Sequence, residues 1–275
     1  MTDELVNMTS QEVKRYLDEN SVDQYNLVDV RQGWEYEEYH LPGAALIPLP
    51  ELADRLNEIR SDRPTIVYCA AGGRSAAAAN LLKGQGFTDV YNMLGGIKSW
   101  KNEYAIGPQS LGMIYFSGNE TALEILYLAY GMEISIASFY TKTASSVTPE
   151  LAETFKSLAR FEEGHKAKIF GAARQLDPSL KTREAMEVKA AAGKVLEGGI
   201  TLEEFLERTR NYLDFPNGAL EAAMIFEAQA LDLYMRCSKK AANSSSAEIL
   251  RWLAQEEKGH LKILGSMLER KAANP

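Results

Sequence analysis

A cysteine followed by a glycine-rich turn is the first feature of this sequence that could do chemistry. Cys69 ends the apolar run TIVYC and opens the segment CAAGGRS, which contains Gly72, Gly73 and Arg74. Between a strand and a helix, backbone N–H groups converge on such a sulfur and favour its thiolate. The two glycines let the backbone curl around a small anion, and Arg74 adds positive charge. The pattern indicates a nucleophile beside an anion-binding loop, although the loop alone also fits a buried cysteine before an ordinary turn.

Two acid–histidine pairs at equal spacing form the second feature. Glu162 and His165 are three residues apart, as are Glu257 and His260, so each pair shares one helix face and can reach one ion. The chain has only three histidines, and two of them take equivalent positions in these pairs. Chance placement explains this poorly.

Two further acids, Glu133 and Glu227, interrupt otherwise apolar helix stripes. They could pair with Lys or Arg or lie on a solvated face, and each histidine could be a packed core residue. However, the stripes contain almost no Lys or Arg, and burying unpaired carboxylates costs several kcal/mol each. Two divalent cations would balance the four inward acids, and carboxylate with imidazole suits iron or manganese.

The elements that position the cysteine are of the α/β type. Up to about Tyr104, the β-rich runs YNLVDV, ALIPL, TIVYC and DVYNM alternate with helical patterns. One helix is predicted over 9–17, where Thr9 and Glu12 have capping-box spacing, and another over 75–83, closed by Gly84. We expect a parallel sheet flanked by helices.

The elements that position the acids and histidines are long helices. Helical patterns cover 119–144, 148–174, 218–241 and 245–271, with shorter ones near 182–195 and 201–212. Glu133 matches Glu227 at an offset of 94 and His165 matches His260 at 95, which indicates a duplicated helical hairpin. We expect a four-helix bundle over 118–275, an α/β domain over 1–105 and a linker over 106–117.

Composition narrows the function classes. The net charge of −8 and the lack of a basic run argue against binding to nucleic acid or to an anionic membrane. Two cysteines cannot build a disulfide framework, and the first residues lack a signal-peptide pattern, so we expect a cytoplasmic protein. The most apolar stretch, 123–137, is interrupted by Glu124 and Glu133 and is predicted to be a buried helix too short to cross a membrane.

The first hundred residues resemble the rhodanese family in four motifs, in order and spacing: LVDVR at 27–31, EYEEYHLPGAALIPL at 35–49, VYCAAGGRS at 67–75 and NMLGGIKSW at 92–100. The resemblance implies that Cys69 carries a sulfane sulfur as a persulfide and passes it to a thiol. It also implies that Arg74, Gly72, Gly73 and Ser75 bind a donor such as thiosulfate. Four residues separate Cys69 from Arg74, as in sulfur-handling rhodaneses, whereas related phosphatases have a loop one residue longer. We interpret the other family matches as structural, Asp29, Arg31 and His40.

The stretch 119–271 is similar to the rubrerythrin branch of the ferritin-like dimetal bundles, including a Tyr seven residues after each single Glu. The resemblance implies two bound metals, most often iron, held by Glu133, Glu162, His165, Glu227, Glu257 and His260. Two departures weaken the match to peroxide-reducing rubrerythrins. Ala230 stands where a further ligand Glu is usual, and two cysteines cannot form a four-cysteine rubredoxin module.

We therefore expect a sulfurtransferase coupled to a di-iron centre that reacts with peroxide or dioxygen, in a homodimer supplied with electrons by a separate carrier. Two alternatives stay open. The bundle could store metal or only dimerise the chain, or the protein could deliver sulfur and iron. Cys237 could be a resolving thiol, but its helical setting favours packing. The acidic segment 35–38 is predicted to be a solvated surface.

Overall fold

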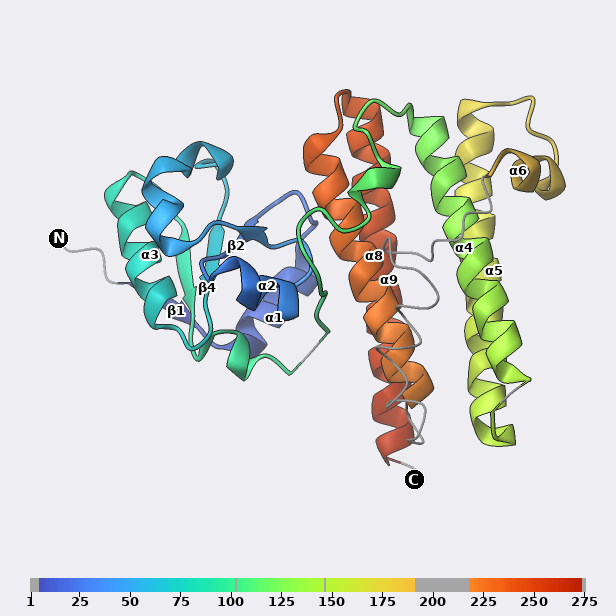
Figure 1. The fold of residues 1–275 in the computed structure, drawn as a ribbon, viewed down its shortest axis with the longest axis horizontal. Coiled ribbons are helices and arrows are strands. Elements are labelled where there is room, and N and C mark those ends of the chain that lie inside the picture. The colour runs from blue at the N-terminus through green and yellow to red at the C-terminus, as the bar shows by residue number, and fades with distance from the viewer. Residues whose placement is uncertain (1–4, 102, 146, 191–217, 274–275) are drawn as a thin grey trace. The chain divides into compact units, whose positions relative to one another are not determined.

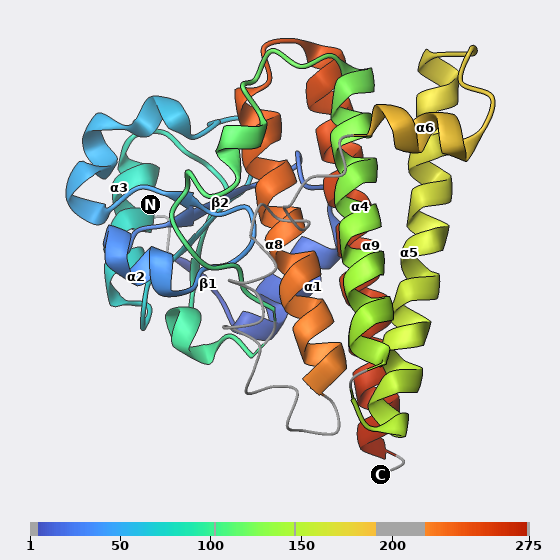
Figure 2. The same ribbon diagram turned by 45° about the vertical axis from the view of Figure 1, so that its right-hand side comes forward.

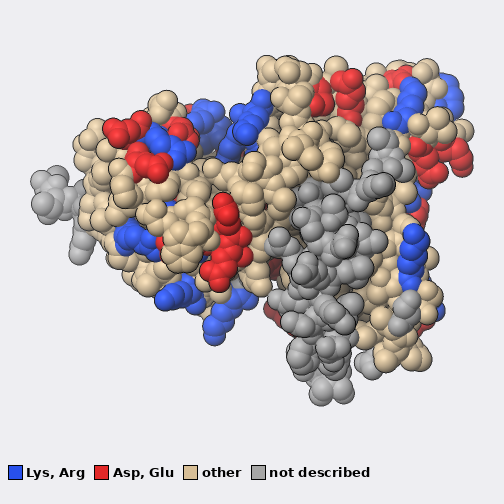
Figure 3. All heavy atoms as spheres, viewed as in Figure 1, with Lys and Arg blue, Asp and Glu red and all other residues tan. Residues whose placement is uncertain are grey.

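The computed structural model describes residues 5–101, 103–145, 147–190 and 218–273. They form two compact units, Met1–Gln109 and Ser110–Pro275 (Figure 1). The first is α/β and the second is helical, as the sequence predicts. On the face drawn in Figure 3, the Lys and Arg side chains of the described residues are interspersed with Asp and Glu rather than gathered in one broad basic surface.

The first unit is built on a five-stranded sheet in which every pair of neighbours is parallel. The strand order is β1-β5-β4-β2-β3. All four residues of the central strand β4 are buried, which is typical of a parallel strand covered on both faces. The strand bounds are β1 Val6–Met8, β2 Asn26–Asp29, β3 Ala45–Leu46, β4 Thr65–Tyr68 and β5 Val90–Met93.

Short helices connect these strands. Helix α1 (Ser10–Glu19) begins with the predicted capping box between Thr9 and Glu12. Helix α3 (Gly73–Gly84) does not end before Gly84 as expected; the chain turns two residues later at Gly86, whose φ is 91°. Strand β1 and helix α2 (Gly33–Glu38) were not predicted, because three and six residues are too few to show a period. Three short 3₁₀ helices complete the unit, Leu49–Asp54, Leu56–Glu58 and Gly96–Ser99.

Four long helices make the second unit, and their bounds lie within three residues of the predicted ones. Helix α4 packs mainly on α5 and helix α8 mainly on α9, so the bundle consists of two hairpins (Figures 1 and 2). The short helix α6 (Arg183–Lys189) lies where 182–195 was predicted, while residues 191–195 of that prediction and the predicted helix 201–212 fall outside the described residues. The long helices are α4 Ala122–Ala144, α5 Pro149–Leu176, α8 Gly218–Lys240 and α9 Ser244–Ala273.

Helix α4 has the length and apolar composition to cross a membrane, and it is longer than the apolar stretch 123–137. However, 56% of its most apolar window is buried inside the protein. Its buried residues include the aromatic side chains Tyr130, Phe139 and Tyr140. Because a core helix meets the same length and composition criteria, we interpret α4 as a core helix of the bundle.

Residues of the predicted linker 106–117 belong to one unit or the other. Gly107 donates its N–H to the carbonyl of Glu37 at 2.7 Å, within the first unit. Leu111 accepts a hydrogen bond from the Arg236 guanidinium at 2.9 Å, within the second unit. The boundary between the units lies at Gln109 and Ser110.

Candidate functional site

The cysteine loop joins the buried end of β4 to the N-terminus of α3. Cys69 follows β4 directly and is 1% exposed. Gly72 caps α3 with a φ of 99°, a conformation that suits only glycine well, whereas a Cβ at Gly73 would meet open space. The first of the two glycines is therefore the one that the loop geometry requires.

The sulfur of Cys69 lies within a set of hydrogen-bond donors. Gly72 donates its backbone N–H to Sγ at 3.1 Å, and the Ser75 hydroxyl lies 3.4 Å from the same atom. Burial by itself would raise the pKa of the thiol, but hydrogen bonds from Ser75 and from the amides of Ala71 and Gly72 outweigh it and lower the pKa below its ordinary value. The loop thus favours a thiolate, the form that acts as a nucleophile.

Two asparagines that the sequence analysis did not single out support Ser75. The buried Ser75 hydroxyl donates to Oδ1 of Asn92 at 2.7 Å. Asn92 in turn donates its amide to Oδ1 of Asn7 at 2.8 Å. The pairing of β1 with β5, in which Asn7 faces Asn92, brings the asparagines together. Asn7 belongs to the strand that the sequence did not reveal, so no local signal could have found it.

Arg74 is bound by a carboxylate from α2. Its two terminal nitrogens each lie 2.7 Å from an oxygen of Glu35, in a bidentate pair. Hydrogen bonding from Arg74 is the main reason why the pKa of Glu35 falls to about 2. The prediction that segment 35–38 is a solvated surface is therefore wrong for Glu35, whose side chain is 13% exposed, although Glu37 and Glu38 are exposed.

Asp29, Arg31 and His40, which were predicted to be structural, contact neighbouring residues of the first unit. Asp29 and Arg31 form a buried ion pair of 2.7 Å, and Arg31 also donates to the carbonyl of Tyr39 at 2.6 Å. His40 stacks on the ring of Tyr36 at 3.6 Å, and its Nδ1 lies 2.8 Å from the Tyr36 carbonyl oxygen. These contacts stabilise the segment 29–40, which includes α2.

The six acids and histidines of the second unit lie together in the bundle. Helices α4 and α8 each supply one carboxylate, and α5 and α9 each supply a Glu-x-x-His pair. All six side chains are buried, with exposed fractions of 4% or less: Glu133, Glu162, His165, Glu227, Glu257 and His260. Residues almost a hundred positions apart in the sequence therefore share one interior site.

Two groups within this set have the geometry to hold metal ions. Glu133, Glu162 and His165 each offer a ligand atom within 4.8 Å of one another, and so do His165, Glu257 and His260. Nδ1 of His165 lies 2.5 Å from Glu133, and Nε2 lies 3.8 Å from Glu257. The groups share His165, so they are parts of one continuous site.

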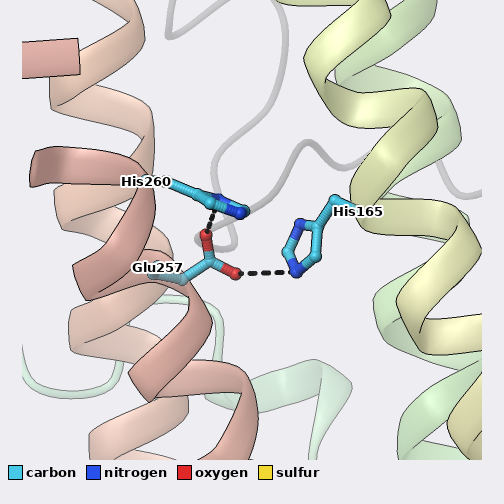
Figure 4. A group of neighbouring side chains, drawn as sticks. All are labelled: His165, Glu257 and His260. Carbon is cyan, nitrogen blue, oxygen red and sulfur yellow. Dashed lines mark hydrogen bonds and ion pairs between the residues drawn. The ribbon is translucent and has the colours of Figure 1, made fainter. Parts of the chain in front are cut away.

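His260 brings Glu227 into the second group. Its Nδ1 lies 2.9 Å from Glu257 and 3.2 Å from Glu227. Figure 4 shows Glu257 between the two imidazoles, whose ring centroids are 4.3 Å apart and whose planes are nearly perpendicular. Four carboxylates and two imidazoles enclosed in an apolar bundle are a donor set that fits two divalent cations.

The aromatic and apolar neighbours of this set are also placed as the duplication predicts. Tyr140 and Tyr234, each seven residues after a single Glu, are completely buried. Ala230 is completely buried as well, so no acid occupies the helix position where a further ligand would be expected.

The second cysteine lies away from solvent. Cys237 is 2% exposed, and its sulfur lies 3.6 Å from that of Met113. Burial raises the pKa of the Cys237 thiol to about 12. A thiol in this setting stays protonated and packs as a small apolar residue.

Two family models match the chain. The model described as Rubrerythrin matches residues 124–211 and 218–274, more than half of the chain. This chain belongs to the rubrerythrin family. The model described as Rhodanese-like domain matches residues 9–103 of this rubrerythrin, a range that includes the whole Cys69 loop. The second unit is thus a rubrerythrin domain, which implies a metal centre, and the first is a rhodanese-like domain.

Curated relatives match the first unit of this rubrerythrin. It is 47% identical over 74 residues to "Uncharacterized protein YqhL" of Bacillus subtilis (strain 168), covering 27% of the chain and 59% of that protein. It is 40% identical over 81 residues to "Putative sulfur carrier protein YrkF" of the same strain, covering 30% of the chain and 44% of that protein. It is 40% identical over 78 residues to "Thiosulfate sulfurtransferase GlpE" of Pseudomonas syringae pv. syringae (strain B728a), covering 28% of the chain and 74% of that protein. The chain thus spans less than two thirds of the first two relatives.

Solved structures match the same unit. A rhodanese-like domain protein from Staphylococcus aureus is 32% identical, with a TM-score of 0.33, over 35% of this chain and 91% of that one. A "rhodanese with anions from E. coli" is also 32% identical, with a TM-score of 0.29, over 30% of this chain and 99% of that one.

Proposed function

We propose that the first unit transfers sulfane sulfur through a persulfide on Cys69. The thiolate attacks the outer sulfur of the donor, a bond forms between that sulfur and Sγ, and the sulfur–sulfur bond of the donor breaks. The rest of the donor leaves with the bonding electron pair, as sulfite from thiosulfate or as a thiolate from an organic persulfide. A thiol acceptor then takes the sulfur and releases Cys69 as thiolate. The observation that carries the proposal is the position of Sγ among the Gly72 N–H, the Ser75 hydroxyl and the Ala71 amide, which lower its pKa.

The same donors suit the persulfide as well as the thiolate. The terminal sulfur of a persulfide carries negative charge once its proton is lost, and the backbone N–H groups at the start of α3 would stabilise that charge. Gly72 and Ser75 would hold Sγ, while the exposed Gly73 leaves the loop open to donor and acceptor.

Mass spectrometry of the intact protein tests this proposal. After incubation with a sulfane-sulfur donor, the wild-type protein should gain the mass of one sulfur atom, and peptide mapping should place it on Cys69. The Cys69→Ser variant should gain nothing, whereas Cys237→Ser should gain as much as the wild type. Wild-type protein that remains unmodified with every donor would refute sulfur transfer.

We further propose that the second unit holds two iron ions, with manganese as the alternative metal. Glu133, Glu162, Glu227 and Glu257 would supply oxygen ligands, and His165 and His260 would supply nitrogen ligands. Two bound iron ions would supply the electron-transfer chemistry by which peroxide or dioxygen is reduced. The residues of the chain orient the ligands and exclude bulk water, since all six side chains are buried.

The electrons for such a reaction would come from a separate carrier protein. The whole sequence has two cysteines, which cannot form a four-cysteine iron module. Glu257 lies between His165 and His260, so its carboxylate would hold metal together with both imidazoles. We take peroxide or dioxygen reduction linked to sulfur or oxidative-stress metabolism as the function of the whole chain.

Elemental analysis of protein purified without oxygen tests the metal proposal. We expect close to two metal ions per chain and their loss from the Glu162→Ala, Glu257→Ala double variant. The exposed pair Glu153→Ala, Glu248→Ala is the matched control, because both acids lie on α5 and α9 but face solvent. Metal content without peroxide- or dioxygen-dependent oxidation would instead favour a bundle that stores metal or dimerises the chain.

A further inference from the structure

The positive charge beside the Cys69 loop is already neutralised within the protein. Nη1 and Nη2 of Arg74 bind the two oxygens of Glu35 in parallel, each at 2.7 Å. Two parallel hydrogen bonds between a guanidinium and a carboxylate are among the strongest polar contacts in proteins. The Glu35 side chain is 13% exposed and the Arg74 side chain 35%, so the pair lies at the protein surface with its carboxylate largely shielded.

Glu35 is held from a second side by its own helix. Its Oε2 accepts the backbone N–H of Gln32 at 3.0 Å and so caps the N-terminus of α2. This hydrogen bond orients the carboxylate independently of Arg74. The pKa of Glu35 is about 2, mainly because of Arg74, so the carboxylate is ionised throughout the physiological range.

Arg74, Glu35 and the Cys69 thiolate together carry one net negative charge. Arg31 and Asp29, whose charges also act on the Glu35–Arg74 pair, form a buried ion pair with each other and leave that balance unchanged. Arg74 is the cation, and Glu35 and the Cys69 thiolate are the anions. A thiosulfate dianion must either meet this net charge or displace Glu35 from Arg74, and both cost binding energy. A donor with at most one charge on its sulfur chain needs no second cation, because the Gly72 N–H and the Ser75 hydroxyl already face Sγ.

We propose that the Glu35–Arg74 pair sets the donor preference of the loop, so that Cys69 takes sulfur from organic persulfides in preference to thiosulfate. This inference rests on the proposed sulfur transfer. The Cys69 thiolate attacks the outer sulfur of R–S–SH, the Sγ–S bond forms, and the sulfur–sulfur bond of the donor breaks. The leaving group is the thiolate R–S⁻, the proton stays on the transferred sulfur, and no external oxidant or reductant is needed.

Steady-state kinetics with two donors and one acceptor thiol tests the preference in the full-length protein. For the wild type, kcat/KM with cysteine persulfide should exceed kcat/KM with thiosulfate by at least about tenfold. In Glu35→Gln, which keeps the shape of the side chain, Arg74 is released. The kcat/KM with thiosulfate should then rise about tenfold, while the kcat/KM with cysteine persulfide should change less than about twofold.

Two further variants separate this effect from a general change of charge or structure. Glu58→Gln removes a carboxylate that binds Arg55 through both oxygens elsewhere in the first unit, and it should leave both values unchanged. In the Glu35→Gln, Arg74→Gln double variant, the gain for thiosulfate should disappear, because the gain depends on the released guanidinium.

The outcomes distinguish this inference from the function on which it rests. Equal or better use of thiosulfate by the wild type would overturn the donor preference while leaving sulfur transfer intact, and this result stands even if Glu35→Gln does not fold. A thiosulfate value that is unchanged in folded Glu35→Gln would overturn the role of the pair. Failure of both donors to modify Cys69 would instead refute the proposed function itself.

Discussion

At the scale of single residues, one hydroxyl group connects the nucleophile to the sheet. Ser75 has a single proton but three acceptors, with the Asn92 oxygen at 2.7 Å, the Gly72 carbonyl at 3.1 Å and Sγ of Cys69 at 3.4 Å. The shortest contact is to Asn92, and the contact to sulfur strengthens when the sulfur is charged. Ser75 is therefore a positioning residue for the thiolate.

The variant Ser75→Ala tests this role through the pH dependence of thiol reactivity. Hydrogen bonds from Ser75 lower the pKa of Cys69, so their loss should raise it and reduce the thiolate fraction at neutral pH. We expect the midpoint of the iodoacetamide alkylation profile to move to higher pH and sulfur transfer at pH 7 to fall about three- to tenfold. Ser10→Ala, which removes a hydroxyl that donates to the Ser99 carbonyl, should leave the alkylation midpoint unchanged.

Glu35 makes the stability of the first unit depend on pH in acid. Its pKa falls from 4.5 to about 2 in the folded protein, so its contribution is complete above pH 4.5 and is lost as the pH falls through about 2. We expect Glu35→Gln to lower the free energy of unfolding by about 1 kcal/mol at pH 7, because the pair is partly screened by solvent. Urea unfolding from pH 7 to pH 2 should show the two proteins converging. A constant difference over this range would contradict the assignment.

At the scale of secondary structure, the Cys69 loop is held by the 3₁₀ turn that follows β5. Ile97 donates its N–H to the carbonyl of Cys69 at 2.8 Å, and Lys98 donates to that of Ala70 at 3.1 Å. Gly96 lies so close that an added Cβ would stand 2.3 Å from the Cys69 carbonyl oxygen and 2.6 Å from the Ala71 nitrogen. The motif NMLGGIKSW is thus part of the loop architecture.

Replacement of Gly96 by alanine should disrupt the loop. The clash is with backbone atoms of Cys69, Ala70 and Ala71, and the φ of 56° adds strain for any other residue. We expect a loss of more than about 3 kcal/mol of stability in the first unit and no persulfide on Cys69. Gly33→Ala is the matched control, because a Cβ there meets no atom within 4 Å. Persulfide formation at the wild-type level in Gly96→Ala would contradict the packing argument.

At the scale of the whole molecule, two sites of different chemistry lie in two separate units of one chain. Among the described residues, the candidate metal ligands belong to the unit Ser110–Pro275, and Gly72 and Ser75, which contact Sγ of Cys69, belong to Met1–Gln109. In the bundle, each hairpin supplies two carboxylates and one imidazole. Neither hairpin alone encloses the site, because His165 of the first contacts Glu257 of the second.

Removal of metal should therefore destabilise only the bundle. Ions that bind the folded state and not the unfolded state raise stability by mass action, and without them four buried carboxylates lose their countercharges. We expect chelation to lower the melting temperature of the second unit by on the order of 5–10 °C and to leave persulfide formation within about twofold. Calorimetry with parallel mass spectrometry of the chelated protein measures both. A matching fall in persulfide formation would instead indicate that the two sites are coupled.

The sequence alone determined the two-unit architecture, the four long helices, most of the sheet and the six acids and histidines that the bundle gathers. Those features have local causes. Long apolar stripes repeat with the helical period, the buried β4 is a continuous apolar run, and duplication repeats the same spacing of Glu and His.

Only the tertiary structure decided which polar groups meet across the sequence. Glu35 and Arg74 are 39 residues apart, and Asn7 and Asn92 are 85 apart. Neither pairing has a local signature, because each depends on which strand lies beside which and on where a six-residue helix begins. The charge balance around Cys69 follows from such contacts, so the sequence indicated a nucleophile whose donor preference depends on the packing of α2 against the loop.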